Sequence, residues 1–148
     1  MPFLTRERTY QSLHSESSLG PKTSIHTLAK PLMKVMYHRA VLDLIQRQRG
    51  VPLTPGTMHI YESYLVREYV AKATKRSILG EIYDRALLEG EAPVVADFLV
   101  SYDALLDSTD VAIRNWTCWI LAALSCHSST RGAVIAIQPC ARLITLLQ

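Results

Sequence analysis

The chain has 148 residues, of which 49% are hydrophobic and 20% are charged, so its composition is that of a folded protein rather than a disordered one. Its 16 basic and 13 acidic residues give a net charge of +3, and this small balance of scattered charges argues against nucleic acid as a partner. No segment approaches the roughly 20 consecutive apolar residues that cross a bilayer, so no membrane partner is expected.

The first 23 residues are polar and rich in serine, which predicts a flexible arm over 1–23. From residue 24 onward, apolar residues recur at helical spacing, and a helix is expected to run from near Pro31 to a stop at Gly50. Thr54 and Pro55 then have the residue types of a helix N-cap and of the first helical position.

The segment 55–89 has a helical pattern, but its division is open between one long helix and two or three short ones, with Gly80 as a candidate kink. A single helix is expected over 94–106. The turn over 108–110 carries N-cap side chains, and it precedes a long helix over 111–124 whose few polar interruptions predict burial on several sides.

The C-terminal part of the sequence predicts a short helix over 132–137 and the start of another beyond it. No strand pattern is present, so the predicted fold class is all-α. Close to its end the sequence has four apolar residues that should pack on a further helix: Leu143, Ile144, Leu146 and Leu147. They either cover the preceding helices or leave an apolar patch for a partner or for a second copy of the chain.

Leu105-Leu106 and Leu146-Leu147 are 41 residues apart, a spacing expected of armadillo and HEAT repeats. The sequence from Leu105 onward resembles the armadillo repeat, in which a helix ending in Leu-Leu leads through a polar turn to a long helix and then a short one. The resemblance is best over about 94–148, and the matching residues are Val111, Thr117, Cys118, Trp119, Leu121 and Leu124. It implies a right-handed helical solenoid over 24–148, in which stacked repeats bury each other's apolar faces.

In this family the successive long helices form a groove, and the resemblance implies that Asn115, Trp116 and Ala123 lie in it. Trp119 falls on the family's tryptophan and is expected mainly in the core, but it shares a helix face with Trp116 and is also a groove candidate. Ala123 stands where the family has the asparagine that bonds an extended peptide. Binding would therefore depend on apolar and aromatic anchors rather than on an asparagine ladder.

No set of residues points to catalysis, to a cofactor or to a metal. Cys126-His127 has no second pair at metal-ligand spacing. Glu89 and Glu91 are interpreted as solvated carboxylates at a helix end. The odd number of cysteines predicts reduced, mostly buried thiols in an intracellular protein, without distinguishing cytoplasm from nucleus. These cysteines are Cys118, Cys126 and Cys140.

The sequence therefore predicts a protein–protein interaction module without catalytic activity, whose partner is another protein or a peptide. The alternative is self-association through the C-terminal apolar residues, as a homo-oligomer or as a piece of a longer solenoid. Contact with nucleic acid is less favoured than a solvated face, and it would use four basic residues, Arg67, Lys72, Lys75 and Arg76.

Overall fold

A computed structural model of the chain describes residues 25–137, 139, 144 and 145, and every regular element among them is helical. The all-α class is therefore confirmed for this part of the chain. Several predictions fall outside the described residues: the arm over 1–23, Cys140, Leu143, Leu146 and Leu147.

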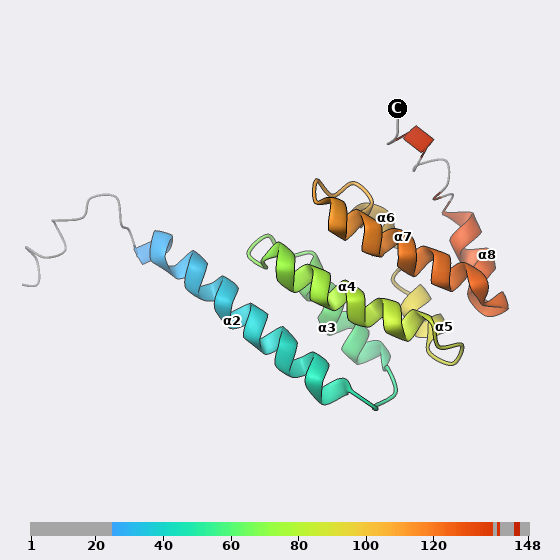
Figure 1. Ribbon diagram of the computed structural model, residues 1–148, viewed down its shortest axis with the longest axis horizontal. Coiled ribbons are helices and arrows are strands. Elements are labelled where there is room, and N and C mark those ends of the chain that lie inside the picture. The colour runs from blue at the N-terminus through green and yellow to red at the C-terminus, as the bar shows by residue number, and fades with distance from the viewer. Residues whose placement is uncertain (1–24, 138, 140–143, 146–148) are drawn as a thin grey trace, which may run out of the picture.

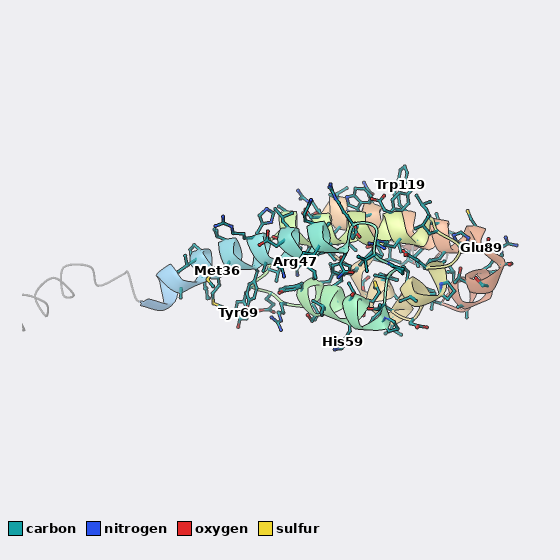
Figure 2. All side chains as sticks on the ribbon, turned by 90° about the horizontal axis from the view of Figure 1, so that it is seen from below. Met36, Arg47, His59, Tyr69, Glu89 and Trp119 are labelled. Atoms are coloured by element: carbon teal, nitrogen blue, oxygen red, sulfur yellow. The ribbon has the colours of Figure 1, made fainter. Side chains whose placement is uncertain are left out.

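Three longer helices lie side by side and run in the same direction (Figure 1). They are α2 (Ile25–Gln48), α4 (Lys72–Ala86) and α7 (Val111–Cys126). Shorter helices return the chain between them, namely α3 (Pro55–Leu65), α5 (Ala92–Ala96) and α6 (Leu99–Leu105), and α8 (Ser128–Ala136) follows α7. The edge-on view of Figure 2 shows two layers, with α3 and α5 below the layer that contains α2, α4 and α7.

The hydrophobic core lies between these layers and is centred on α4, which packs against α2, α3, α5 and α7. It consists of fully buried apolar side chains from both layers, among them Tyr61, Ile78, Ile82, Tyr102 and Ile120. Helix α4 supplies residues at the helical spacing of three and four, so one face of this helix is buried along its length. Its opposite face is left to line the surface described below.

The helix boundaries follow the expected local chemistry at three places. The Thr54 hydroxyl accepts a hydrogen bond of 3.2 Å from the Thr57 N–H at the start of α3. The Asp110 carboxylate accepts one of 3.0 Å from the Ile113 N–H at the start of α7. Gly50 has φ of 73°, the left-handed conformation that ends many helices, and it follows α2. All three predictions are confirmed.

Other boundaries differ from the sequence prediction. Helix α2 begins at Ile25, so Pro31 lies inside the helix rather than near its start. This proline is exposed, so the carbonyl group that loses a helical hydrogen bond there can be hydrated. Helix α8 begins at Ser128 rather than at residue 132, because the Arg131 N–H already donates a hydrogen bond of 2.9 Å to the His127 carbonyl.

Two segments each form two helices. The sequence left the number of helices open in one of them and predicted a single helix in the other. Residues 55–89 form α3 and α4, and Gly80 lies within the continuous helix α4. The single helix expected over 94–106 is wrong, because the chain leaves the helical conformation at Phe98, with φ of −108° and ψ of 22°. Apolar residues keep helical spacing across this break, so periodicity carries no signal of it.

Candidate functional site

One face of α7 is open to solvent, although other helices pack against it on several sides. Its buried face comprises Ile113, Thr117, Ile120, Leu121, Ala123 and Leu124. Its exposed face comprises Val111, Asn115, Trp119, Ala122 and Cys126, which recur at intervals of three and four residues. Helices α4, α6 and α8 pack against α7, and no described element covers this second face. Figure 2 shows the Trp119 side chain projecting from it.

A hollow of about 290 Å³ lies on this open face between α4 and α7. Its walls are Tyr83 from α4 and Ala112, Asn115, Trp116 and Trp119 from α7. Three of the four predicted groove residues are thus brought together. None of the five wall residues carries a charge at neutral pH, so the hollow is an apolar, mostly aromatic site.

Tyr83 holds the two indole rings of the hollow in place. Its ring centroid lies 5.8 Å from that of Trp116 at an interplanar angle of 58°, and 5.8 Å from that of Trp119 at 81°. Edge-on contacts of this kind add about 0.5–1.5 kcal/mol beyond the area they bury. The rings therefore form fixed walls, and sequence reasoning missed Tyr83 because it lies 33 residues before Trp116 on another helix.

Gly80 explains how close Trp116 comes to α4. A Cβ atom at Gly80 would lie 3.8 Å from Cη2 of the Trp116 ring, so the indole lies directly over the bare backbone of the helix. Trp116 is half-buried as a result and packs against the hydrophobic core. Any side chain larger than alanine at position 80 would displace this ring.

The two predicted positions that differ from expectation are Trp119 and Ala123. Trp119 is 59% exposed rather than in the core, and Ala123 is only 5% exposed and does not line the hollow. Each residue of an α-helix is rotated by about 100° from the last, so Trp119 points well away from its buried neighbour Ile120. Ala123 lies three residues after Ile120 and shares its buried face.

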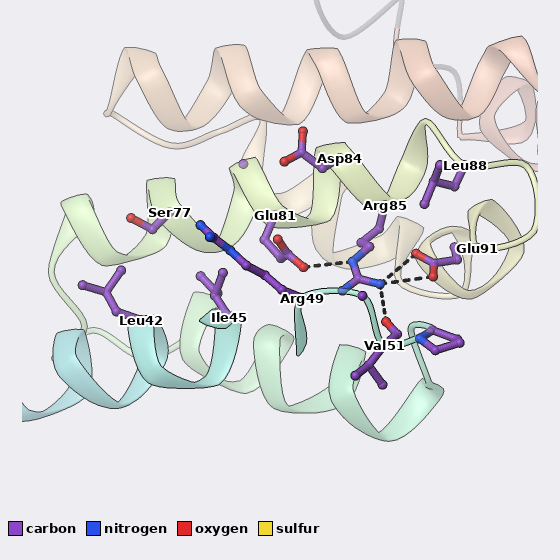
Figure 3. Close-up of a pocket in the computed structure, with 13 residues that line it drawn as sticks. Leu42, Ile45, Arg49, Val51, Ser77, Glu81, Asp84, Arg85, Leu88 and Glu91 are labelled. Atoms are coloured by element: carbon purple, nitrogen blue, oxygen red, sulfur yellow. Dashed lines mark hydrogen bonds and ion pairs between the residues drawn. The ribbon is translucent and has the colours of Figure 1, made fainter. Parts of the chain in front are cut away.

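A second hollow of about 750 Å³ lies on the other side of α4, between this helix and α2 (Figure 3). Its apolar lining includes Leu42, Ile45 and Leu88, and its charged lining includes Arg49 and Asp84. Gly80 also lines it, so the two hollows adjoin across α4 at the glycine that contacts Trp116.

Arg85 lies buried at the edge of this second hollow and joins four segments of the chain. Its guanidinium donates to Glu81 at 2.9 Å and to Glu91 at 3.1 Å, as Figure 3 shows, and to the Val51 carbonyl at 2.6 Å. Glu91 also accepts the Leu53 N–H at 3.0 Å. Glu91 is therefore not the solvated carboxylate that the sequence suggested, because it helps to neutralise a buried cation.

The four basic residues considered for nucleic acid do not form one free face. Arg67 lies over the rings of Tyr37 and Tyr64, at 5.8 and 5.7 Å from their centroids. Arg76 pairs with Asp110 at 2.5 Å, and this hydrogen bond, together with the one from the Ile113 N–H, lowers the pKa of the Asp110 carboxyl.

The described residues contain no cluster of three or more histidine, cysteine or acidic side chains that could hold a metal ion. Burial raises the pKa of the Cys118 thiol, whereas Cys126 is exposed, which corrects the expectation of mostly buried thiols. Within the same part of the chain, no helix has both the length and the apolar character needed to cross a membrane.

Comparison of the chain with known protein families, with curated proteins and with solved structures gives no match.

Proposed function

We propose that the chain is a protein–protein interaction module without catalytic activity, organised as an armadillo-like solenoid. The hollow between α4 and α7 then receives an apolar side chain of a partner protein or peptide. The observation that carries this proposal is the Trp119 indole, which is largely exposed although its ring is fixed edge-on against Tyr83. An exposed indole that is already held in one position can be buried by a partner at little cost in side-chain entropy, which is why tryptophan and tyrosine dominate interface energetics.

The arrangement of the helices supports the solenoid part of the proposal. Each of the long helices α2, α4 and α7 is followed by shorter returning helices, and α4 packs against both α2 and α7. Stacking of neighbours in one direction is how helical repeats bury faces that a single repeat cannot bury. In such an array the long helices present a shared surface, and here that surface carries both hollows.

The size of the aromatic hollow indicates what enters it. Its volume of about 290 Å³ lies at the lower limit of the pockets that hold drug-sized molecules, so it suits one side chain of a larger partner. The exposed amide of Asn115 lies at its wall and can bond to the backbone of the same partner segment. The expected ligand is a segment that places one large apolar residue between the two indoles.

Selection of peptides from a random displayed library, using the full chain as bait, tests the proposal. We expect selected peptides to bind the wild-type chain in calorimetry and to lose at least about tenfold in affinity to the Trp119→Ala variant, since truncation of an interface anchor costs about 2 kcal/mol or more. The matched control is Val100→Ala on α6, because Val100 is the most exposed large apolar residue described, at 82%. Peptides that bind both variants as tightly as wild type would place the partner site elsewhere.

Self-association is the second candidate, and it is favoured by Ile144, which is 60% exposed. If the C-terminal apolar residues join two copies, the mass measured by light scattering should rise with protein concentration, and Ile144→Glu should abolish the rise. A monomeric mass at every concentration would exclude this candidate and leave the aromatic hollow as the site to pursue.

A further inference from the structure

Helix α2 carries apolar side chains on opposite sides in its two halves. In the C-terminal half, Val41 is fully buried and Leu44 and Ile45 pack against the core. In the N-terminal half, the large apolar side chains are turned outward, with Leu32 exposed by 62%, Val35 by 65% and Met36 by 62%. Leu32 precedes Val41 by nine residues, which is a rotation of about 900°, so the two point in opposite directions.

The outward side chains of α2 have no partner within the described chain. Helix α2 packs against α4, and its first turns extend past the other helices (Figure 1). Neither of the hollows beside α4 is lined by Leu32, Val35 or Met36, and a third hollow, of about 420 Å³, is lined by Lys30, Lys34 and Tyr69 among others. The outer face of α2 is therefore a convex apolar stripe rather than a groove.

The segment formed by α2 and the turn after it has an excess of positive charge. Residues 25–52 hold five basic residues, Lys30, Lys34, Arg39, Arg47 and Arg49, against one acidic residue, Asp43. This segment therefore has a charge of +4 (five minus one), whereas the whole chain has +3, so the remaining residues sum to −1. All six side chains are exposed and none forms an ion pair with a described residue.

We propose that the outer face of α2 docks on the surface of an anionic phospholipid bilayer. Leu32, Val35 and Met36 enter the boundary between headgroups and acyl chains, while Arg39 and Arg47, on the outward half of the helix, contact lipid phosphates. Apolar residues and unpaired cations on one convex helix face are the combination that such an interface binds.

The other anionic or apolar occupants fit these observations less well. Nucleic acid supplies phosphates but offers little apolar surface for the exposed stripe. A second copy of the chain would bring two segments of charge +4 together. The sequence-based expectation that no membrane is involved considered only spanning segments, and a helix that lies on a bilayer needs no span. An acidic protein surface is the remaining competitor, and the experiment below separates it.

Co-sedimentation of the full chain with unilamellar vesicles tests the proposal. The probes are vesicles of phosphatidylcholine alone and vesicles with about 30% phosphatidylserine, because the surface potential of anionic lipid attracts basic residues. We expect binding to the anionic vesicles only, weakened by added salt. The double variant Arg39→Gln/Arg47→Gln should bind the anionic vesicles about 25-fold more weakly than wild type, at about fivefold for each arginine. The variant Met36→Asp should bind them at least about tenfold more weakly.

The control variants make the same kinds of substitution at exposed positions outside α2. Lys72→Gln/Arg131→Gln deletes two exposed cations outside α2, and Val100→Asp adds a charge to the exposed face of α6. Both should bind like wild type. The α2 variants and Val100→Asp should keep the wild-type melting temperature because the substituted residues are exposed. Trp119→Ala should also bind vesicles normally, which separates this inference from the proposed protein site.

Two results would overturn the inference. If the wild-type chain stays in the supernatant with anionic vesicles at low salt, a bilayer is excluded and an acidic protein surface becomes the occupant to seek. If the control variants lose binding as much as the α2 variants do, the attraction is a diffuse effect of net charge and α2 is not the docking face.

Discussion

The Nη2 atom of Arg85 lies 2.5 Å from the carbonyl oxygen of Gln48, so a side chain of α4 satisfies the last residue of α2. The carbonyl groups at the end of a helix have no partner within that helix and carry its partial negative charge, which a cation stabilises. Glu81 and Glu91 neutralise the same guanidinium from the other side. One buried arginine thus fixes the angle at which α2 leaves the rest of the molecule.

Replacement of Arg85 by methionine should lower the free energy of unfolding by about 3–5 kcal/mol, because it leaves two partly buried carboxylates without their cation. Urea unfolding followed by circular dichroism measures the change. Arg85→Lys keeps the charge but loses the planar fork of donors, so its free energy of unfolding should lie between those of Arg85→Met and wild type. A loss below about 1 kcal/mol for Arg85→Met would show that the cluster is solvated, as exposed ion pairs are.

Substitution of alanine should stabilise the fold at two glycines and destabilise it at a third. Gly80→Ala should raise the free energy of unfolding by up to about 1 kcal/mol, since its new Cβ meets Trp116 at an ordinary contact distance of 3.8 Å and the helix gains rigidity. Gly132→Ala, with open space around it, is the matched control and should behave alike. Gly50→Ala should cost about 1–2 kcal/mol because of its positive φ. Thermal denaturation of the three variants checks the order, and a destabilised Gly80→Ala would contradict the placement of the indole.

The two tryptophans should differ in their contribution to folding. Trp119→Ala should cost about 1 kcal/mol, the value of its edge contact with Tyr83, whereas Trp116→Ala should cost about 2–3 kcal/mol, because this ring packs on the core. Single-tryptophan variants made by Trp→Phe give a second measurement, since acrylamide should quench the emission of Trp119 more strongly. Equal quenching of the two would place both indoles in one environment, contrary to the structure.

Alkaline pH should destabilise the fold through Tyr61. Burial, reinforced by Glu81 and opposed by Arg85, raises the pKa of the Tyr61 hydroxyl from 10.0 to about 12. The folded state therefore keeps this proton after the unfolded state has lost it. The contribution to stability is complete below pH 10 and is lost as the pH rises towards 12.

Unfolding measured between these pH values should show a shallower loss of stability for Tyr61→Phe than for wild type. The buried Tyr61 hydroxyl has no hydrogen-bond partner among the described residues, so this variant should lie within about 1 kcal/mol of wild type at neutral pH. Tyr69→Phe is the control, because Tyr69 is exposed and its removal should leave the pH dependence intact. An unchanged slope in Tyr61→Phe would assign the alkaline loss to other groups.

Local chemistry explains which parts of the fold the sequence could predict. The residue types at Thr54, Asp110 and Gly50 each predict a helix end from a single position. A hydroxyl or a carboxylate can accept a hydrogen bond from the first turn of a helix, and a residue without a Cβ can adopt the positive φ that ends one. The break at Phe98 has no such mark. The apolar spacing around it is that of one uninterrupted helix, so only tertiary packing decides it.

The site was predictable in part for a related reason. Asn115, Trp116 and Trp119 could be grouped because they are close in sequence on one helix, but Tyr83 and Gly80 come from α4 and no local pattern ties them to α7. Arg85 did leave a signal. It lies three residues after Ile82 on the buried stripe of α4, and a charged residue at such a position needs buried partners.

Helix α2 gives the core just one fully buried side chain among its described residues, Val41, with Leu44 and Ile45 partly buried beside it. The contact of Tyr37 with Tyr64, the hydrogen bond of 2.7 Å between His38 and Thr74 and the bond from Arg85 to Gln48 add to these. A helix held by so few contacts can open while α3 to α8 stay folded. Amide hydrogen exchange should then show α2 exchanging earlier than α4 and α7. Local unfolding would then be concentrated at the α2 end of the molecule, which is also the end that carries the outward apolar stripe.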